Sequence, residues 1–189
     1  MARLFLIRHG EPEAAWGSAD DDPGLSSSGR AQAEAAAQAL LAEGALAAFT
    51  SPMRRCRETA ASYERLAGVR AAIEPRVSEV PTPAGVSDRR TWLQQNFPWR
   101  GGAPRTWSAL DEALHAWRRE MLACIRAFER DTAVFTHFIA VNVIAGAALG
   151  REDTIVCKPG YASITEIEVS PGGLRLVRFG DEMQTGEVR

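Results

Sequence analysis

Short apolar segments alternate with longer amphipathic ones along this chain, which predicts strands alternating with helices. Apolar runs at residues 4–7, 45–50 and 133–137 are typical of buried strands, and residues 69–80 contain a further one. Helices are expected over residues 31–43, from Pro52 to about 67, over 108–130 and over 138–149. Two late runs, 163–169 and 174–179, flank a Ser-Pro-Gly-Gly segment and predict a hairpin.

This order of elements indicates an α/β fold. Strands alternating with helices imply a mostly parallel central sheet covered by helices on both faces, a three-layer doubly wound sandwich. The C-terminal hairpin should add an antiparallel edge to that sheet. The length of 189 residues suits one domain, so we expect a single domain over residues 1–189.

Residues 81–106 show no regular spacing of hydrophobic residues and are rich in proline and glycine, with tryptophans at 92 and 99. A segment of this length predicts a lid-like excursion over the domain. The alternative is that its aromatic residues simply form local core.

Polar groups follow each of the first four predicted strands. Arg8-His9 follows the first strand, Ser51 to Arg55 the second, Glu79 the third, and His137 ends the fourth. The carboxyl ends of parallel strands share one edge of a sheet, so these groups should converge there. A solvated strand end is the alternative reading for each of them when it is taken alone.

The residue types in this set suit phosphoryl transfer. A histidine can serve as the nucleophile, and arginines neutralise charge on the phosphoryl oxygens. A carboxylic acid can protonate the leaving oxygen and then accept a proton from the attacking water. None of these steps needs a metal ion, so we expect no cofactor and no metal site.

Composition narrows the class of protein further. A formal net charge of −2 gives no basic field for nucleic acid, and no apolar stretch approaches the length that spans a bilayer. Three scattered cysteines, Cys56, Cys124 and Cys157, suit reduced thiols in a cytoplasmic protein. We therefore expect a cytoplasmic protein with no nucleic-acid or membrane partner; its oligomeric state stays open.

The chain resembles the histidine phosphatase superfamily, also called the phosphoglycerate mutase-like family. The resemblance covers residues 4 to about 150 in order and spacing, and it rests on these segments: Arg8-His9-Gly10-Glu11; Leu25-Ser26 with Gly29 and Gln32-Ala33; Ser51-Pro52-Met53-Arg54-Arg55-Cys56-Arg57-Glu58-Thr59-Ala60; Glu79; and Thr136-His137.

The resemblance implies a role for each matched position. It implies that His9 is the nucleophile that becomes phosphohistidine and that Arg8 and Arg55, rather than Arg54, hold the phosphate. His137 would stabilise the transferred group and Glu79 would be the general acid. Gly10, Ser51 and Phe138 are the expected substrate contacts. The third histidine, His115, falls within a predicted helix and is expected to lie outside the site.

Some positions depart from the family pattern. Pro12 and Ala15 stand where the family often has Thr and Asn, Phe138 replaces a Gly, and Asn142 stands where Arg is frequent. The Gly and Trp-Glu-Gly features common after the acid are absent. These departures alter the expected rim of the pocket and leave its four histidine and arginine groups in place.

The function expected is a metal-independent phosphomonoesterase that acts through a phosphohistidine on a small phosphorylated substrate. The alternatives are a phosphoglycerate-type mutase, a phosphohistidine protein phosphatase, or a non-catalytic phosphate-binding or regulatory protein. Four arginines in the excursion, at positions 89, 90, 100 and 105, suggest that the substrate carries a second anionic group.

Overall fold

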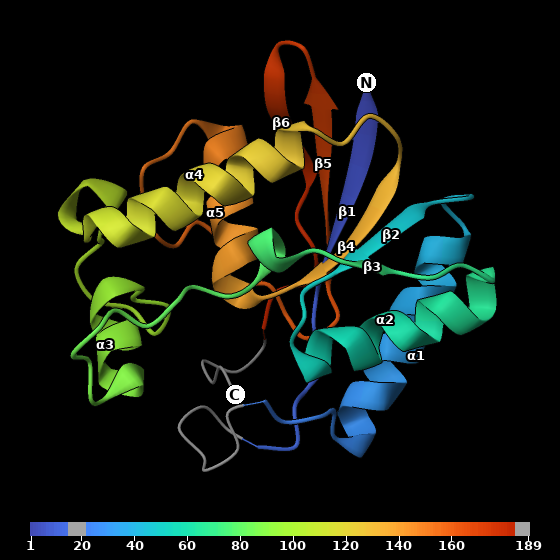
Figure 1. The fold of residues 1–189 in the computed structure, drawn as a ribbon, viewed down its shortest axis with the longest axis horizontal. Helices are drawn as coiled ribbons and strands as arrows, with labels where there is room; N and C mark the ends of the chain where they lie inside the picture. The colour runs from blue at the N-terminus through green and yellow to red at the C-terminus, as the bar shows by residue number, and fades with distance from the viewer. Residues whose placement is uncertain (15–21, 184–189) are drawn as a thin grey trace.

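Four parallel strands end at the same edge of a six-stranded sheet with the order β3-β2-β4-β1-β5-β6 (Figure 1). The computed structural model describes residues 1–14 and 22–183. Its parallel strands are β1 (Ala2–Arg8), β2 (Ala47–Thr50), β3 (Ala72–Ile73) and β4 (Thr132–Thr136). The hairpin strands β5 (Ile164–Ser170) and β6 (Gly173–Arg178) add an antiparallel edge next to β1, as predicted.

Helices cover both faces of this sheet. Helices α1 (Ser27–Leu41) and α2 (Arg54–Ala67) lie on one face, and α4 (Glu112–Arg126) and α5 (Phe138–Leu149) lie on the other (Figure 1). The remaining helical segments are α3 (Arg89–Asn96) and two 3₁₀ turns, η1 (Pro75–Val77) and η2 (Trp107–Ala109). The expected α/β sandwich is therefore confirmed.

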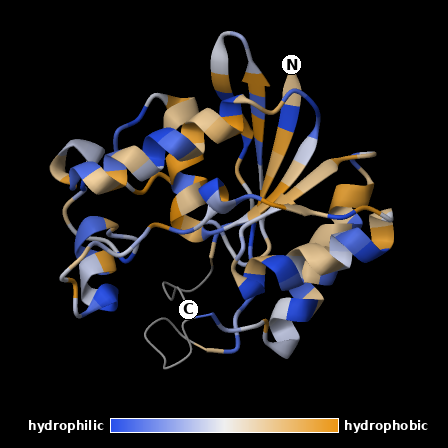
Figure 2. Ribbon diagram, in the orientation of Figure 1, coloured by the Kyte–Doolittle hydropathy of each residue, from blue (hydrophilic) through white to orange (hydrophobic). Residues whose placement is uncertain are grey.

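Strand β1 is buried on both of its faces. Leu4 and Leu6 belong to the core under α4 and α5, whereas Phe5 and Ile7 belong to the core under α1 and α2. Burial on both faces explains why the strand is a continuous apolar run instead of an alternating one. Helix α5 is likewise hydrophobic almost all round, as Figure 2 shows. The residues that follow β1 therefore begin in the buried centre of the molecule.

The helix predicted over residues 108–130 is shorter than expected. A 3₁₀ turn occupies Trp107–Ala109, and α4 begins only at Glu112 and ends at Arg126. The cause is tertiary: the Trp107 amide donates to the Glu152 carbonyl at 2.9 Å, and the Trp107 side chain is buried. Leu110, between the 3₁₀ turn and α4, has an extended backbone with a ψ of 164°, so a helix cannot continue through it.

The segment 81–106 has more regular structure than its sequence suggested. It contains α3, which Asp88 caps by accepting a hydrogen bond from the Thr91 amide at 3.0 Å. Leu93, Phe97 and Trp99 are buried in the core beneath α4 and α5. Its aromatic residues therefore serve as core. Closure of the segment over the site stays a prediction, as does the assignment of residues 1–189 to one domain.

Within the described ranges, no helix is long and apolar enough to cross a membrane.

Candidate active site

The register of the sheet brings the polar strand ends together. Arg8 lies opposite Thr136 in the β1–β4 pair, and the next residue, His9, donates its backbone N–H to the Thr136 carbonyl at 2.9 Å. On the other side of β4, the Ser51 amide donates to the Phe135 carbonyl at 3.0 Å. The three strands therefore end level with one another, so the residues that follow them meet.

His9 is buried with one ring nitrogen unprotonated. Its Nδ1 lies 2.9 Å from the Gly10 carbonyl oxygen, which can only accept, so Nδ1 carries the proton and Nε2 keeps its lone pair. Burial lowers the pKa of His9 well below its usual value, and the positive charges of Arg55 and Arg8 lower it further. A neutral imidazole with a free Nε2 is the form that a nucleophilic histidine requires.

His137 lies beside His9, with 5.4 Å between the ring centroids. Its Nδ1 is 3.3 Å from Arg55 Nη2, and because a guanidinium can only donate, Nδ1 is the acceptor. The Nε2–H group then donates to the Ser51 hydroxyl at 2.8 Å. Burial, and then the charge of Arg55, lower the pKa of His137 well below its usual value, so this ring is also neutral.

Arg8 is completely buried and lacks an ion-pair partner among the described residues. Its Nη1 donates to the Pro159 carbonyl at 2.8 Å, whereas Nε and Nη2 have no hydrogen-bond partner in the described ranges. The guanidinium lies 4.0 Å from the ring centroid of Tyr161 and 5.1 Å from that of Phe138. A buried cation with unused donors is a binding site for an anion.

Arg55 supplies the second buried guanidinium, at the first turn of α2. Its side chain is nearly covered, it contacts His137, and its Nη1 lies 3.8 Å from Asp22 Oδ1. Arg54, by contrast, is about half exposed and pairs with Glu58 at 2.7 Å on the outside of the helix. The structure thus places Arg55 in the site and Arg54 outside it.

Glu79 lies at the N-terminus of α5. Its Oε2 accepts from the Ile139 amide at 3.2 Å, and its Oε1 accepts from the Val80 amide at 3.0 Å. Desolvation raises the pKa of this carboxyl above its ordinary value, and the two amide hydrogen bonds oppose that effect without cancelling it. Glu79 is therefore held by the Ile139 amide, two residues after His137 in the chain, and its burial shifts its titration toward the protonated form.

The three expected substrate contacts also lie at the site. Gly10 donates its amide to Thr59 Oγ1 at 3.0 Å, and a Cβ atom at Gly10 would come within 2.5 Å of the Gly29 carbonyl oxygen. Ser51 holds His137, and the buried Phe138 ring faces Arg8. In this structure, each of the three positions a neighbouring site residue.

Sequence reasoning missed the position of Tyr161 and the structural role of Asn142. Tyr161 lies over Arg8, and no motif around it signals this position. Asn142 is buried and accepts from the Val156 and Cys157 amides at 2.7 and 3.0 Å, so it anchors the loop that leads to Tyr161. The sequence analysis named Asn142 only as a departure from the family pattern, and its apolar surroundings within a helix were a further signal. Ala15, another departure from the family pattern, falls outside the described residues.

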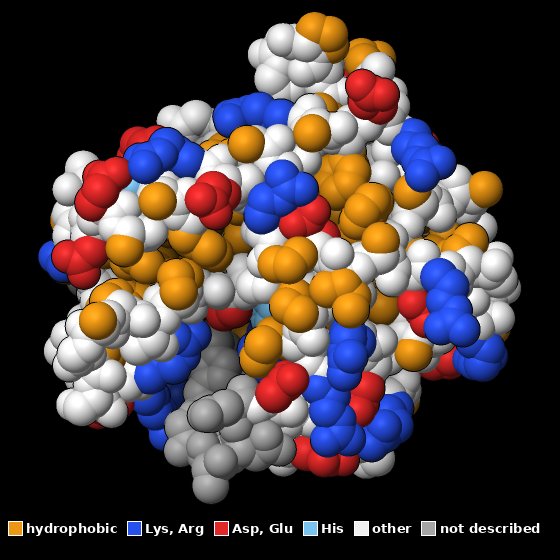
Figure 3. All heavy atoms as spheres, in the orientation of Figure 1, with side chains coloured by type: hydrophobic (Ala, Val, Ile, Leu, Met, Phe, Trp, Pro, Cys, Tyr) orange, Lys and Arg blue, Asp and Glu red, His pale blue; other side chains and the backbone are white. Residues whose placement is uncertain are grey.

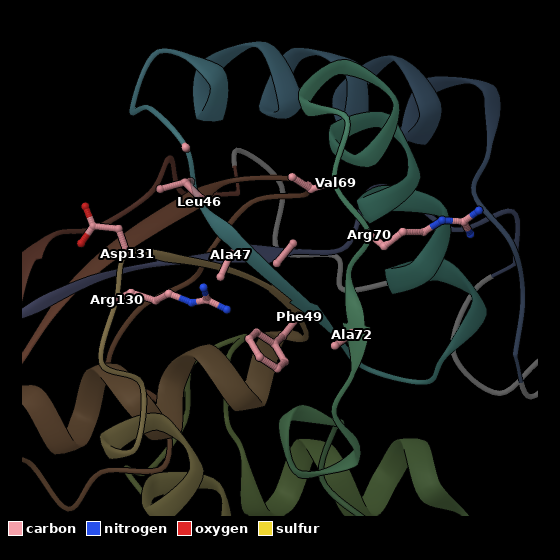
Figure 4. Close-up of a pocket in the computed structure, with 10 residues that line it drawn as sticks. Leu46, Ala47, Phe49, Val69, Arg70, Ala72, Arg130 and Asp131 are labelled. Atoms are coloured by element: carbon pink, nitrogen blue, oxygen red, sulfur yellow. The ribbon is translucent and has the colours of Figure 1, made fainter.

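A separate groove lies at the opposite end of the strands. Figure 4 shows it beside β2 and β3, where Ala47, Phe49 and Ala72 line it together with Arg130, whereas the side chain of Arg70 points away from these residues. It contains no histidine and lies away from the carboxyl ends of the strands. Across residues 1–14 and 22–183, no group of three or more His, Cys, Asp or Glu side chains is arranged to hold a metal ion.

Comparison with known proteins identifies relatives over most of the chain. The sequence profile of the histidine phosphatase superfamily (branch 1) matches residues 4–182. A probable phosphoglycerate mutase from Photorhabdus laumondii subsp. laumondii is 29% identical over 168 residues, which is 79% of this chain and 76% of that protein.

Solved structures share the fold over nearly the full length. A mycobacterial glucosyl-3-phosphoglycerate phosphatase superposes with a TM-score of 0.73 at 21% identity, covering 97% of this chain and all of that one. A phosphoserine phosphatase from Entamoeba histolytica, solved with phosphoserine, superposes with a TM-score of 0.67 at 20% identity, covering 95% and 96% of the two chains.

The burial of neutral His9 predicts a pH-dependent stability. Below about pH 6.5 the unfolded chain binds a proton at this histidine and the folded chain does not, so the free energy of unfolding falls as the pH falls. When the pH is lowered from about 7.5 to about 5.5, the free energy of unfolding should fall in both proteins. The fall should be about 1 kcal/mol smaller in His9→Gln than in the wild type, because the variant lacks this titrating group. Urea denaturation at both pH values measures this difference; equal losses in the two proteins would contradict it.

Proposed function

The chain belongs to the histidine phosphatase superfamily, and we propose that it is a metal-independent phosphomonoesterase that forms a phosphohistidine at His9. The observation that carries the proposal is the joint burial of two neutral histidines beside two guanidinium groups. The family match confirms the resemblance seen in the sequence. Phosphatases among its structural relatives support hydrolysis as the reaction.

Phosphate binding is the first step of the proposed reaction. The unused Nε and Nη2 groups of Arg8 donate to phosphoryl oxygens, and Arg55 turns its Nη2 from His137 toward them. Charge-assisted hydrogen bonds of this kind are stronger than neutral ones, and the low dielectric constant of a buried site strengthens them further. The two cations thereby neutralise the substrate dianion.

Transfer of the phosphoryl group to His9 follows. Nε2 attacks phosphorus, the bond between phosphorus and the ester oxygen breaks, and protonated Glu79 gives its proton to that oxygen. Water then attacks the phosphohistidine, Glu79 accepts the proton from water, and Nε2 is released with inorganic phosphate as the product. Both proton transfers use the same carboxyl group in opposite directions.

His137 stabilises the transferred group as its charge spreads over the equatorial oxygens. The Ser51 hydroxyl can either accept from Nε2 or donate to it. When it donates, Nδ1 of His137 carries the proton and faces the position that Arg55 Nη2 now occupies. Ser51 therefore allows the ring to change from acceptor to donor without moving.

The alternatives differ in the fate of the phosphoryl group, in the substrate, or in whether a transfer takes place at all. A mutase returns the phosphoryl group to the retained product, and the relative from Photorhabdus is a probable phosphoglycerate mutase. A phosphohistidine protein phosphatase uses the same groups on a protein substrate. A non-catalytic protein would need no acid, whereas Glu79 is buried with a raised pKa and is held by the Ile139 amide, two residues after His137 in the chain. Hydrolysis of a small phosphate ester is the reading that the site favours.

A second anionic group on the substrate is part of this proposal. Of the four arginines of the excursion, Arg90, Arg100 and Arg105 are exposed, whereas Arg89 is partly buried and its charge lowers the pKa values of Glu79 and His137. The Arg89 Nη2 group donates to the Val80 carbonyl at 2.9 Å, which holds the side chain along the rim. Figure 3 shows basic side chains over α3 and near the start of α2.

We place the protein in the cytoplasm, in keeping with its buried free thiols.

Substitution of the nucleophile tests the function directly. Hydrolysis of an aryl phosphate in the presence of EDTA should be abolished in His9→Ala, because no other group receives the phosphoryl group. The wild type should yield a labelled, acid-labile phosphohistidine after rapid quenching, and the variant should yield none. His115→Ala is the matched control because His115 lies on α4, hydrogen-bonded to the Leu110 carbonyl. Turnover that survives in His9→Ala, or that EDTA removes from the wild type, would overturn the mechanism.

Glu79→Gln tests the general acid. We expect kcat to fall about 10²- to 10⁴-fold for an alkyl phosphate and much less for a nitrophenyl phosphate, whose leaving group needs little protonation. In the wild type, kcat/KM for the alkyl ester should decline as the pH rises past the raised pKa of Glu79, and this alkaline limb should vanish in the variant. Equal losses for both leaving groups would refute the role.

Arg89→Gln tests the second anionic group. The KM for 3-phosphoglycerate should rise about tenfold or more, since a hydrogen bond to a charged group is worth about 1.5–3 kcal/mol. The KM for glycerol 3-phosphate, which lacks the carboxylate, should change little. Arg90→Gln, one residue along the same helix but exposed, is the control. If Arg89→Gln affects both esters equally, Arg89 does not select for the second anion.

A further inference from the structure

The environment of Arg8 differs from that of a typical buried arginine. No acidic side chain forms an ion pair with it in the part of the chain that is described, although it is fully buried. Its guanidinium lies over the ring of Tyr161 at 4.0 Å and faces the ring of Phe138 at 5.1 Å. Two aromatic faces therefore stand where a carboxylate is usually found.

The turn that carries Tyr161 is fixed to the backbone of the site. Ala162 has a φ of 53°, a left-handed conformation that is uncommon for a residue with a side chain. Its amide donates to the His9 carbonyl at 3.3 Å, and the Arg8 amide donates to the Ser163 carbonyl at 3.3 Å. These hydrogen bonds join the turn to both residues of the Arg-His pair, so the Tyr161 ring is placed relative to Arg8 by the backbone itself.

We propose that Tyr161 is a positioning residue for phosphate binding: the face of its ring holds the Arg8 guanidinium so that Nε and Nη2 stay available to the phosphoryl oxygens. This inference rests on the proposed use of the site for phosphate. Tyr161 acts through Arg8, and its ring centroid also lies 6.0 Å from that of His9.

An aromatic face suits this position better than a carboxylate would. A carboxylate would form hydrogen bonds with the same N–H groups that bind phosphate and would cancel the positive charge. The ring attracts the cation through its quadrupole and occupies none of the N–H donors that lie in the guanidinium plane. Arg8 therefore keeps both its charge and its donors until the substrate arrives.

Tyr161 acts on Arg8 through its ring face and also through its hydroxyl, whose interaction with the guanidinium opposes the lowering of the Arg8 pKa by burial. The proposal assigns the positioning of Arg8 to the ring face. Tyr161→Phe retains the face and removes only the hydroxyl. Tyr161→Leu removes the face and leaves an apolar side chain, which can neither attract the cation nor fix its plane. Comparison of these two variants separates the ring from the hydroxyl.

Calorimetric titration with inorganic phosphate and with orthovanadate is the experiment. We expect Tyr161→Phe to bind both anions within about twofold of the wild type and Tyr161→Leu to bind them about three- to thirtyfold more weakly. In steady-state assays the Leu variant should show a raised KM and a lowered kcat, and the Phe variant should recover both values. A purely structural role would lower the melting temperature without weakening phosphate binding.

Two results would overturn the proposal: unchanged phosphate affinity in Tyr161→Leu, or an equal loss of affinity in the Phe and Leu variants. If Tyr161→Leu does not fold, Tyr161→Met removes the ring while filling a similar volume and serves in the same comparison. Absence of phosphatase activity from the wild type would refute the proposed function, but the titration would still decide whether Tyr161 supports anion binding by Arg8.

Discussion

The burial of two guanidinium groups at the end of the parallel strands is the interaction on which the rest of the site depends. Desolvation, together with the charge of these groups, holds the pKa values of His9 and His137 low, so both rings are neutral where a nucleophile and an acceptor are needed. A buried cation without an ion-pair partner is unstable by itself. The aromatic faces around Arg8 reduce that cost without supplying an anion that competes with phosphate.

The fold makes this burial possible because β1 lies at the centre of the sheet. Leu4 to Ile7 are covered on both faces, so the next residues leave the strand in the most enclosed part of the molecule. Backbone hydrogen bonds from His9 to β4 and from the Tyr161 turn to His9 then fix the loop on two sides. The same close packing explains Gly10, where a side chain would collide with the backbone of α1.

Local patterns predicted the positions that immediately follow strands, because a strand's end fixes where the next residue lies. Arg8, His9, Arg55 and His137 were found in this way, and the match to the family motif distinguished Arg55 from Arg54, which lies on the outside of α2. Helix α3 and the role of Tyr161 were not predicted. Both depend on contacts between segments far apart in the chain: α3 is stabilised by buried Leu93 and Phe97, and Tyr161 is placed by a turn bound to β1. No local periodicity encodes such contacts.

Glu79 shows how a single carboxyl group can serve both halves of the reaction. Desolvation favours its protonated form, which the first proton transfer requires, whereas the Ile139 and Val80 amides stabilise the carboxylate that results. The nearby charge of Arg89 also favours the carboxylate. Strong burial alone would trap the acid form, and strong hydrogen bonding alone would trap the base. The opposition of these effects is what allows Glu79 to release a proton to the leaving oxygen and then to take one from water.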